Sequence, residues 1–121
     1  MQFRQKIIVL DAADLEAVSG FWSRLFDGRV ARDDDWHTVY VDDKPYLAVQ
    51  LAPDHVPPQW PDGSQQQQVH LDLYVDDLAP AHEQALAAGA ILVQPAEDPA
   101  ANDGFQVYAD PAGHLFCLCW G

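Results

Sequence analysis

The sequence predicts an α+β protein made of two consecutive β-α-β-β-β units within one domain. In each half of the chain, a β-rich segment leads to an aspartate that can cap a helix, and a glycine follows the helix. Each helix leads in turn to further short β-rich segments. A proline- and glutamine-rich segment over residues 53–67 separates the two patterns and is expected to be a linker, and 121 residues suffice for one domain with its own core.

The first unit is expected over residues 1–52. A strand is predicted from Phe3 to Leu10, and Asp14 then caps a helix whose apolar side chains recur every three or four residues up to Phe26. Gly28 follows as the C-terminal cap. Three short strands are expected over residues 28–31, 36–41 and 46–51, with acidic turns between them.

The second unit, over residues 68–121, repeats this order. A strand is predicted from Val69 to Val75, and Asp77 then caps a helix from Leu78 to Ala88 that Gly89 ends. Further strands are expected over residues 90–93, 105–109 and 115–120. The same order of elements in both halves of one chain favours a structural repeat.

Strand alternation divides residues 69–75 into an apolar face and a polar face. The polar face carries His70, Asp72 and Tyr74. On a flat sheet this face would be exposed to solvent, whereas on a curled sheet it lines a concavity. We therefore predict that these three side chains line a pocket, with His70 and Asp72 as the candidates for any catalytic role.

The repeat predicts which other residues join this pocket. Aligning the two units places Gln5 at the position of His70, and Gln50 at the position of Cys117. We therefore expect the side chains of Gln5, Gln50, His70 and Cys117 to converge. The aromatic side chains expected at the mouth of the pocket are Trp36, Tyr40, Trp60, Phe105 and Tyr108.

Composition excludes several classes of partner. Nineteen acidic and six basic residues give a net charge of −13, which repels nucleic acid phosphates and anionic membranes. No apolar run reaches the roughly 18 residues of a membrane helix, and the first residues do not resemble a signal peptide, so a cytoplasmic location is expected.

Cys117 and Cys119 stand two residues apart in a predicted strand. Their side chains are then too far apart for a disulfide, and both are expected to be free thiols.

Three motifs, taken in order, resemble the vicinal oxygen chelate superfamily, which includes glyoxalase I, bleomycin-resistance proteins and extradiol dioxygenases. They are VHLDLYVDDL, YADPAGHLFCLCW and, as in the small glyoxalase-like branch, DAADLEAVSGFWSRLF. The resemblance covers nearly the whole chain. It implies two β-α-β-β-β modules that form a U-shaped, incompletely closed sheet around a pocket, with the helices outside. Because the family commonly pairs, it also implies a homodimer.

In the metal-dependent members of this family, the first and last strands of the modules supply a metal site. Carried over to this sequence, the resemblance implies the ligand positions Gln5, Gln50, His70 and Cys117, of which only His70 is a usual strong ligand. Gln50 and Cys117 stand where the family often has glutamate. Isomerisation of the glyoxalase type needs a Lewis acid and a carboxylate base. Because the glutamates at these positions are missing, we expect that the protein has no metal cofactor. If it does bind a metal, we expect zinc or a similar divalent ion.

Three hypotheses follow for the function. The first is a metal-free protein of the bleomycin-resistance kind, which binds a small aromatic or cationic molecule in its pocket. The second is a metal-dependent lyase or isomerase that resembles glyoxalase I, and the third is a non-catalytic partner domain without a ligand. The missing glutamate ligands favour the first hypothesis over the second, and the polar faces of the predicted strands favour either over the third.

Overall fold

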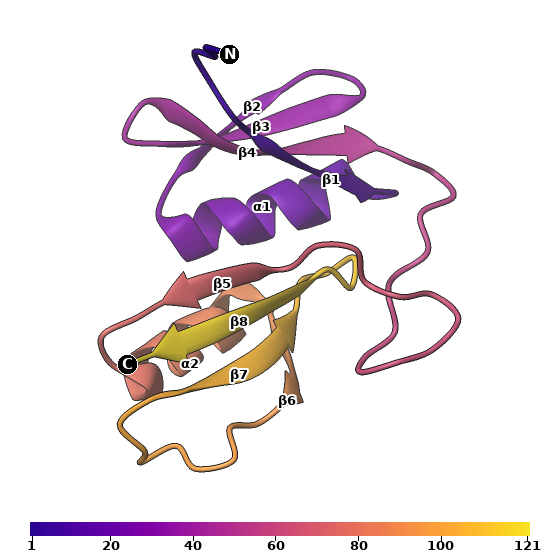
Figure 1. Cartoon of the computed structure of the whole chain (residues 1–121). Coiled ribbons are helices and arrows are strands. Elements are labelled where there is room, and N and C mark those ends of the chain that lie inside the picture. Colours follow the sequence, from indigo (N-terminus) through magenta and orange to yellow (C-terminus); the bar gives the residue numbers. More distant parts are fainter. The chain divides into compact units, whose positions relative to one another are not determined.

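The structure, a computed structural model, describes all 121 residues and contains two helices and eight strands (Figure 1). The strands form two four-stranded mixed sheets, neither of which closes on itself. Each half of the chain supplies one helix and one sheet, which confirms the α+β class and the order β-α-β-β-β in both halves. Neither helix has the length and the apolar composition that crossing a membrane requires.

The chain divides into two compact units, Met1–His55 and Val56–Gly121. The first unit contains α1 (Leu15–Phe26), β1 (Ile8–Ala12), β2 (Arg29–Arg32), β3 (Trp36–Val41) and β4 (Lys44–Leu51). The second contains α2 (Leu78–Ala88), β5 (Leu71–Tyr74), β6 (Ile91–Gln94), β7 (Gly104–Ala109) and β8 (Leu115–Trp120). The strand orders are β1-β4-β3-β2 and β5-β8-β7-β6, so in both units the first strand lies at an edge, parallel to the last.

Aspartates begin both helices, as the sequence predicts. The side chain of Asp14 accepts a hydrogen bond from the backbone N–H of Ala17 at 3.1 Å. The side chain of Asp77 accepts one from the backbone N–H of Ala79 at 3.4 Å. Gly89 ends α2 in the left-handed conformation, with φ of 116°. The predicted caps of α2 are therefore confirmed at both ends.

The first helix ends at Phe26 as predicted, but its C-terminal cap lies one residue earlier, because Asp27 rather than Gly28 takes the left-handed conformation, with φ of 55°. Aspartate is among the few non-glycine residues that tolerate this conformation. Gly28 is required for a different reason. A Cβ at this position would lie 2.3 Å from the carbonyl oxygen of Tyr40 in β3. Only glycine therefore allows the backbone between α1 and β2 to pass this close to β3.

The first strand begins at Ile8 rather than at Phe3, so the predicted strand is too long at its N-terminal end. Its neighbour β4 contains an extra residue, Tyr46, directly after Pro45, which makes a β-bulge. A longer β1 would have to pair with this bulge and with Pro45, which has no N–H to donate. The ring of Tyr46 packs instead against Phe26 of α1, with 5.0 Å between ring centroids.

The common topology confirms the structural repeat but corrects the pairing of residues between the units. Asp14 and Asp77 cap equivalent helices, so counting back from them places Ile7, and not Gln5, at the position of His70. Gln5 lies ahead of β1 and is exposed. The predicted alignment of the two units was therefore wrong by two residues. Because side chains alternate between the faces of a strand every two residues, such a shift leaves the pattern of apolar and polar faces unchanged.

The pairing of the last strands needs the same correction. Asp72 lies opposite Cys117 in the β5–β8 pair, and the equivalent residue of β1, Val9, lies opposite Ala48 in the β1–β4 pair. Ala48, and not Gln50, is therefore the counterpart of Cys117. Neither Ile7 nor Ala48 offers a metal ligand, so the first unit lacks donors at the two positions that correspond to His70 and Cys117.

The predicted linker packs largely against the second unit. Trp60 contacts the buried core made by residues of β7 and β8, and its indole N–H donates a hydrogen bond to the side chain of Gln94 at 3.0 Å. Pro57 lies against Gly113 in the turn before β8. Gly113 has φ of 86°, and a Cβ there would lie 2.4 Å from the Cβ of Pro57. The close approach at Gly113 therefore requires glycine.

We predict that Gly113→Ala destabilises the protein by about 1–3 kcal/mol, because alanine is strained at this φ and its methyl group would meet Pro57. Gly20→Ala is the matched control. Gly20 lies inside α1, where a Cβ would meet only the flexible end of Arg24, so a gain of about 0.5 kcal/mol in helix propensity is expected. Urea unfolding of the two variants checks this. Equal stability of Gly113→Ala and the unmodified protein would contradict the packing of Pro57.

Candidate functional site

One face of the second sheet carries the polar side chains that the sequence predicts to line a pocket. Asp72 lies opposite Cys117, and Tyr74 opposite Cys119, in the β5–β8 pair. Phe105 lies opposite Cys119 in the β7–β8 pair. Residues directly opposite each other on neighbouring strands point to the same side of the sheet. These five side chains therefore share one face.

The other face of this sheet packs against α2. His82 of α2 lies 2.7 Å from the hydroxyl group of Tyr108 in β7. Tyr108 is fully buried and stacks on Phe116 of β8, with 5.4 Å between ring centroids. The expectation that Tyr108 lies at the pocket mouth is therefore wrong. Tyr108 is three residues from Phe105 in β7, so strand alternation places their side chains on opposite faces of the sheet, and that of Tyr108 points toward α2.

The face opposite α2 is hollowed into a groove with a volume of about 700 Å³, which we call the sheet groove. Its walls combine four aromatic rings, two carboxylates, one imidazole and two thiols. These side chains belong to Trp60, His70, Asp72, Tyr74, Asp103, Phe105, Cys117, Cys119 and Trp120. All of them come from the second unit.

Asp72 contacts several of the other groove residues. The Nε2 atom of His70 lies 3.1 Å from Oδ1 of Asp72. Both side chains are partly exposed, at 41% for His70 and 45% for Asp72, so a ligand in the sheet groove can reach them.

The two thiols of the groove stay protonated at neutral pH. The pKa of Cys117 is raised to about 12, mainly by burial and to a smaller extent by the negative charge of Asp72, the neighbouring Cys119 and a hydrogen bond with Asp72. Burial also raises the pKa of Cys119, again with a contribution from Asp72. Because the thiolate is the nucleophilic form, neither cysteine is activated for covalent catalysis.

The geometry of three groove residues fits a metal ion. His70, Asp72 and Cys117 each offer one ligand atom, and these atoms lie within 4.8 Å of one another. A nitrogen, an oxygen and a sulfur ligand suit zinc with an open fourth position. This set differs from the predicted one, because Asp72 joins it, while Gln5 and Gln50 belong to the first unit. Binding requires the Cys117 thiol to lose its proton, which its raised pKa opposes.

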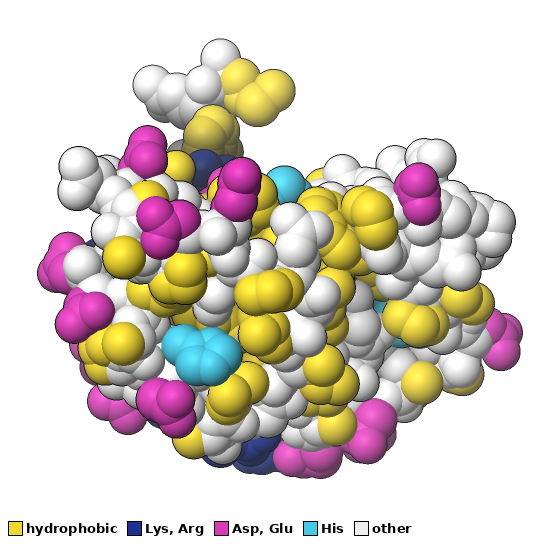
Figure 2. All heavy atoms as spheres, turned by 90° about the horizontal axis from the view of Figure 1, so that it is seen from below, with side chains coloured by type: hydrophobic (Ala, Val, Ile, Leu, Met, Phe, Trp, Pro, Cys, Tyr) yellow, Lys and Arg dark blue, Asp and Glu magenta, His cyan; other side chains and the backbone are white.

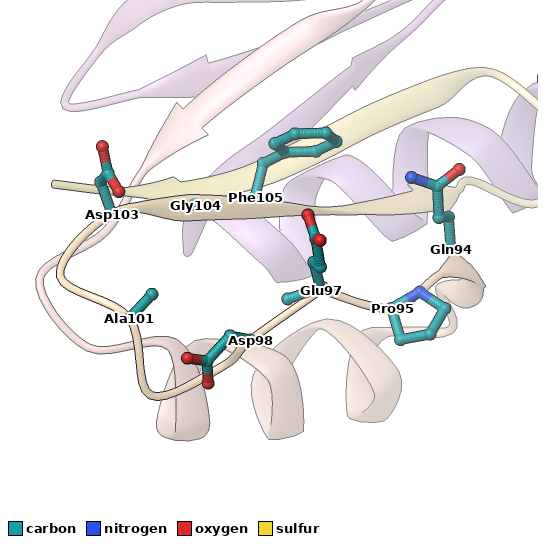
Figure 3. A pocket seen from close by; sticks show the side chains of 9 residues that line it. Gln94, Pro95, Glu97, Asp98, Ala101, Asp103, Gly104 and Phe105 are labelled. Atoms are coloured by element: carbon teal, nitrogen blue, oxygen red, sulfur yellow. The ribbon is translucent and has the colours of Figure 1, made fainter.

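A second hollow of about 610 Å³ adjoins the sheet groove, between β7 and the loop that follows β6. Asp103, Gly104 and Phe105 line both. Figure 3 shows the side chain of Glu97 reaching up toward β7, while that of Asp98 turns away from it. This loop adds carboxylates beside the groove and no positive charge.

The electrostatic character of the second unit is uniformly acidic. It contains no lysine or arginine, since all six basic residues lie within the first 44 positions. In Figure 2, hydrophobic side chains gather in the middle of the view, and Asp and Glu side chains lie toward its edges. An anionic ligand would therefore find no positively charged partner in this unit except a protonated histidine.

The other predicted pocket residues lie in the first unit. Gln5 precedes β1, and Gln50 is exposed on β4, opposite Trp36. The indole N–H of Trp36 donates a hydrogen bond to Thr38 at 3.2 Å. The guanidinium group of Arg29 lies over the ring of Tyr40, 4.4 Å from its centroid. The structure thus gathers His70, Asp72, Tyr74, Phe105 and Cys117 in one groove, with Trp60 beside them.

Three groove residues were missed by the sequence-based predictions. Cys119 follows Cys117 by two residues, so alternation was enough to place it on the same face. Asp103 comes from a loop, where no periodicity applies. By strand alternation, the side chain of Trp120 is expected on the face that packs against α2. Trp120 pairs with Gly104 of β7, however, and a Cβ at Gly104 would lie 2.6 Å from the indole. Without a side chain at Gly104, the indole spreads over the strand and reaches the groove.

Comparison with known proteins gives a family and a fold. Residues 7–119 match the model of the family described as glyoxalase-like domain. No curated protein matches the chain.

Several solved structures are similar to this chain. The fosfomycin resistance protein FosX from Mesorhizobium loti is 16% identical, with 100% of this chain and 94% of that chain covered and a TM-score of 0.70. A glyoxalase-related enzyme from Fulvimarina pelagi is 24% identical over 98% of this chain and 88% of its own, with a TM-score of 0.70. A bleomycin-binding protein complexed with bleomycin is 20% identical, with 98% and 99% covered and a TM-score of 0.65. These likenesses establish the fold.

We predict that Cys117, studied in a Cys119→Ser background, reacts with iodoacetamide at pH 8 on the order of a hundredfold more slowly than free cysteine, because little thiolate is present. Asp72→Asn removes a negative charge that opposes thiolate formation. The pKa of Cys117 then falls and its alkylation accelerates. Asp103→Asn is the control and leaves the rate unchanged. Mass spectrometry follows the reaction, and an unchanged or slower rate in Asp72→Asn would show that Asp72 does not act on this thiol.

Proposed function

The chain belongs to the glyoxalase-like domain family, and from this premise we propose that it binds a small cationic or neutral aromatic molecule in the sheet groove. The observation that carries the proposal is the composition of the groove walls. Four aromatic rings and the carboxylates of Asp72 and Asp103 face a hollow in a unit that contains no lysine or arginine. Aromatic faces attract cations by about 0.5–2 kcal/mol, and the acidic surface raises the rate at which cations arrive.

The proposed ligand site works without a metal. The carboxylate of Asp72 already accepts a hydrogen bond from the Cys117 thiol and lies 3.1 Å from Nε2 of His70, so no metal ion is required beside it. When a cationic ligand enters, this carboxylate supplies the opposite charge. Related proteins support such a use of the fold, since one of the similar structures is a complex with bleomycin. By resemblance to the family, we also propose that the protein forms a homodimer.

A second candidate function is a metal-dependent lyase or isomerase. The ligand atoms of His70, Asp72 and Cys117, which lie within 4.8 Å of one another, favour it. A zinc ion held there would supply a Lewis acid that polarises a carbonyl oxygen of a substrate. Metal content therefore separates the two candidates.

We predict that cationic and neutral aromatic molecules raise the melting temperature more than matched anions do. Benzylamine, benzyl alcohol and benzoate are a suitable series, tested at low and moderate salt. Asp72→Asn should abolish the advantage of benzylamine over benzyl alcohol, whereas Asp54→Asn, an exposed acidic residue outside the groove, should retain it. Preferential stabilisation by benzoate would refute the proposal. Salt affects the long-range part of the attraction, so the preference for the cation should shrink as salt rises.

We expect the protein, purified without a histidine tag, to hold less than one equivalent of any transition metal per chain. The reasons are the protonated Cys117 thiol and the absence of ligands at Ile7 and Ala48. Elemental analysis with a zinc titration measures this. One tightly bound metal per chain that is lost in both His70→Ala and Cys117→Ser would establish the second candidate instead.

A further inference from the structure

A separate hollow of about 510 Å³ lies on the face of the second sheet that α2 covers, and we call it the α2 hollow. It is built from the first half of α2, from β6 to β8 and from the loop after β6. The residues that matter for its chemistry are Leu78, His82, Leu92, Gln106 and Trp120. Gln106 stands between Phe105 and Val107, which pair with Cys119 and Cys117 and share the face of the sheet that carries the groove, so the side chain of Gln106 points to the opposite face.

The orientation of the Gln106 amide follows from its partners. The backbone N–H of Ala96 donates a hydrogen bond to Oε1 of Gln106 at 3.0 Å. Because a backbone N–H only donates, the atom that faces it must be the oxygen. The amide nitrogen therefore faces the hydroxyl group of Tyr108, 2.7 Å away, and donates to it.

The orientation of the Gln106 amide determines where the hydroxyl proton of Tyr108 points. The Tyr108 hydroxyl is buried and accepts from Gln106, so its own proton goes to the remaining partner, Nδ1 of His82, 2.7 Å away. Burial raises the pKa of Tyr108, which keeps this proton in place at neutral pH. The neutral imidazole of His82 therefore carries its proton on Nε2.

Two donors of this network remain unused. The second amide N–H of Gln106 and the Nε2–H of His82 bond to no protein atom, and both side chains line the α2 hollow. Gln106 is only 6% exposed. Both N–H groups open onto the hollow, so an acceptor atom of a bound molecule can bond to them in place of water. The surrounding Leu78, Leu92 and Trp120 offer apolar surface for the rest of that molecule.

We propose that the α2 hollow is a second binding site, which takes an uncharged aromatic molecule with a carbonyl or ring-nitrogen acceptor. The acceptor bonds to Gln106 and His82, and the ring packs against Leu92 and Trp120. An ammonium group is a donor, so it cannot replace the acceptor at Gln106 and His82, although the carboxylates of Asp76 and Asp77 at the hollow can attract it. An anion is repelled by Asp76 and Asp77, which also line the hollow. The proposal does not rest on the ligand proposed for the sheet groove, although Trp120 lines both hollows.

The test uses ¹⁵N-labelled full-length protein titrated with benzamide, benzylamine and benzoate. Benzamide should shift the backbone signals of Leu78 and Ala79 and the side-chain amide of Gln106 saturably, while benzylamine and benzoate should leave the side-chain amide of Gln106 unmoved. The imidazole nitrogens should report the Nε2–H form of His82, and its Nε2 signal should move with benzamide. These readouts need no variant.

Two variants sharpen the test. His82→Phe keeps an aromatic ring but removes the donor, and Gln106→Met keeps the volume but removes the amide, so each should weaken benzamide binding at the α2 hollow at least tenfold. Asp72→Asn should leave it unchanged. Benzamide shifts confined to groove residues such as Tyr74 and Phe105 would overturn this proposal but leave the sheet groove standing. Absence of saturable shifts near Leu78 would also overturn it, and water alone would then satisfy the two donors.

Discussion

The parallel pairing of the first and last strands is the constraint on which each unit depends. A parallel pair needs a long crossover, and in the second unit α2 and the β6–β7 hairpin provide it between β5 and β8. The register of this pair places Asp72 beside Cys117 and Tyr74 beside Cys119. A slip of one residue would turn Asp72 toward α2 and bury its carboxylate among apolar side chains, which is costly.

The chemistry of the sheet groove follows from this register. Asp72 lies 3.1 Å from the imidazole of His70, and its charge adds to the burial that keeps the Cys117 thiol protonated. The groove therefore offers negative charge and aromatic surface but no activated nucleophile. An organic cation can bind to the carboxylates and aromatic rings without any change in the protonation of the groove. Metal-assisted chemistry, in contrast, first requires the Cys117 thiol to lose its proton.

Sequence periodicity predicted the elements better than their exact pairing. The aspartate caps of both helices, the Gly89 cap of α2 and the shared polar face of His70, Asp72 and Tyr74 follow from local rules, and the structure shows them. The correspondence of Gln5 with His70 failed because strand alternation repeats every two residues and cannot detect a two-residue shift. The bulge at Tyr46 and the loop position of Asp103 depend on tertiary contacts, for which the sequence has no periodic signal.

Alternation along one strand also separates two kinds of binding surface. Phe105 and Gln106 are neighbours in β7, and they face the sheet groove and the α2 hollow respectively. The groove presents acceptors, the carboxylates of Asp72 and Asp103, and so favours donors and cations. The hollow presents donors, from Gln106 and His82, and so favours uncharged acceptors. One four-stranded sheet thus carries opposite hydrogen-bonding preferences on its two faces, and the ligand's own donors and acceptors decide which face it binds.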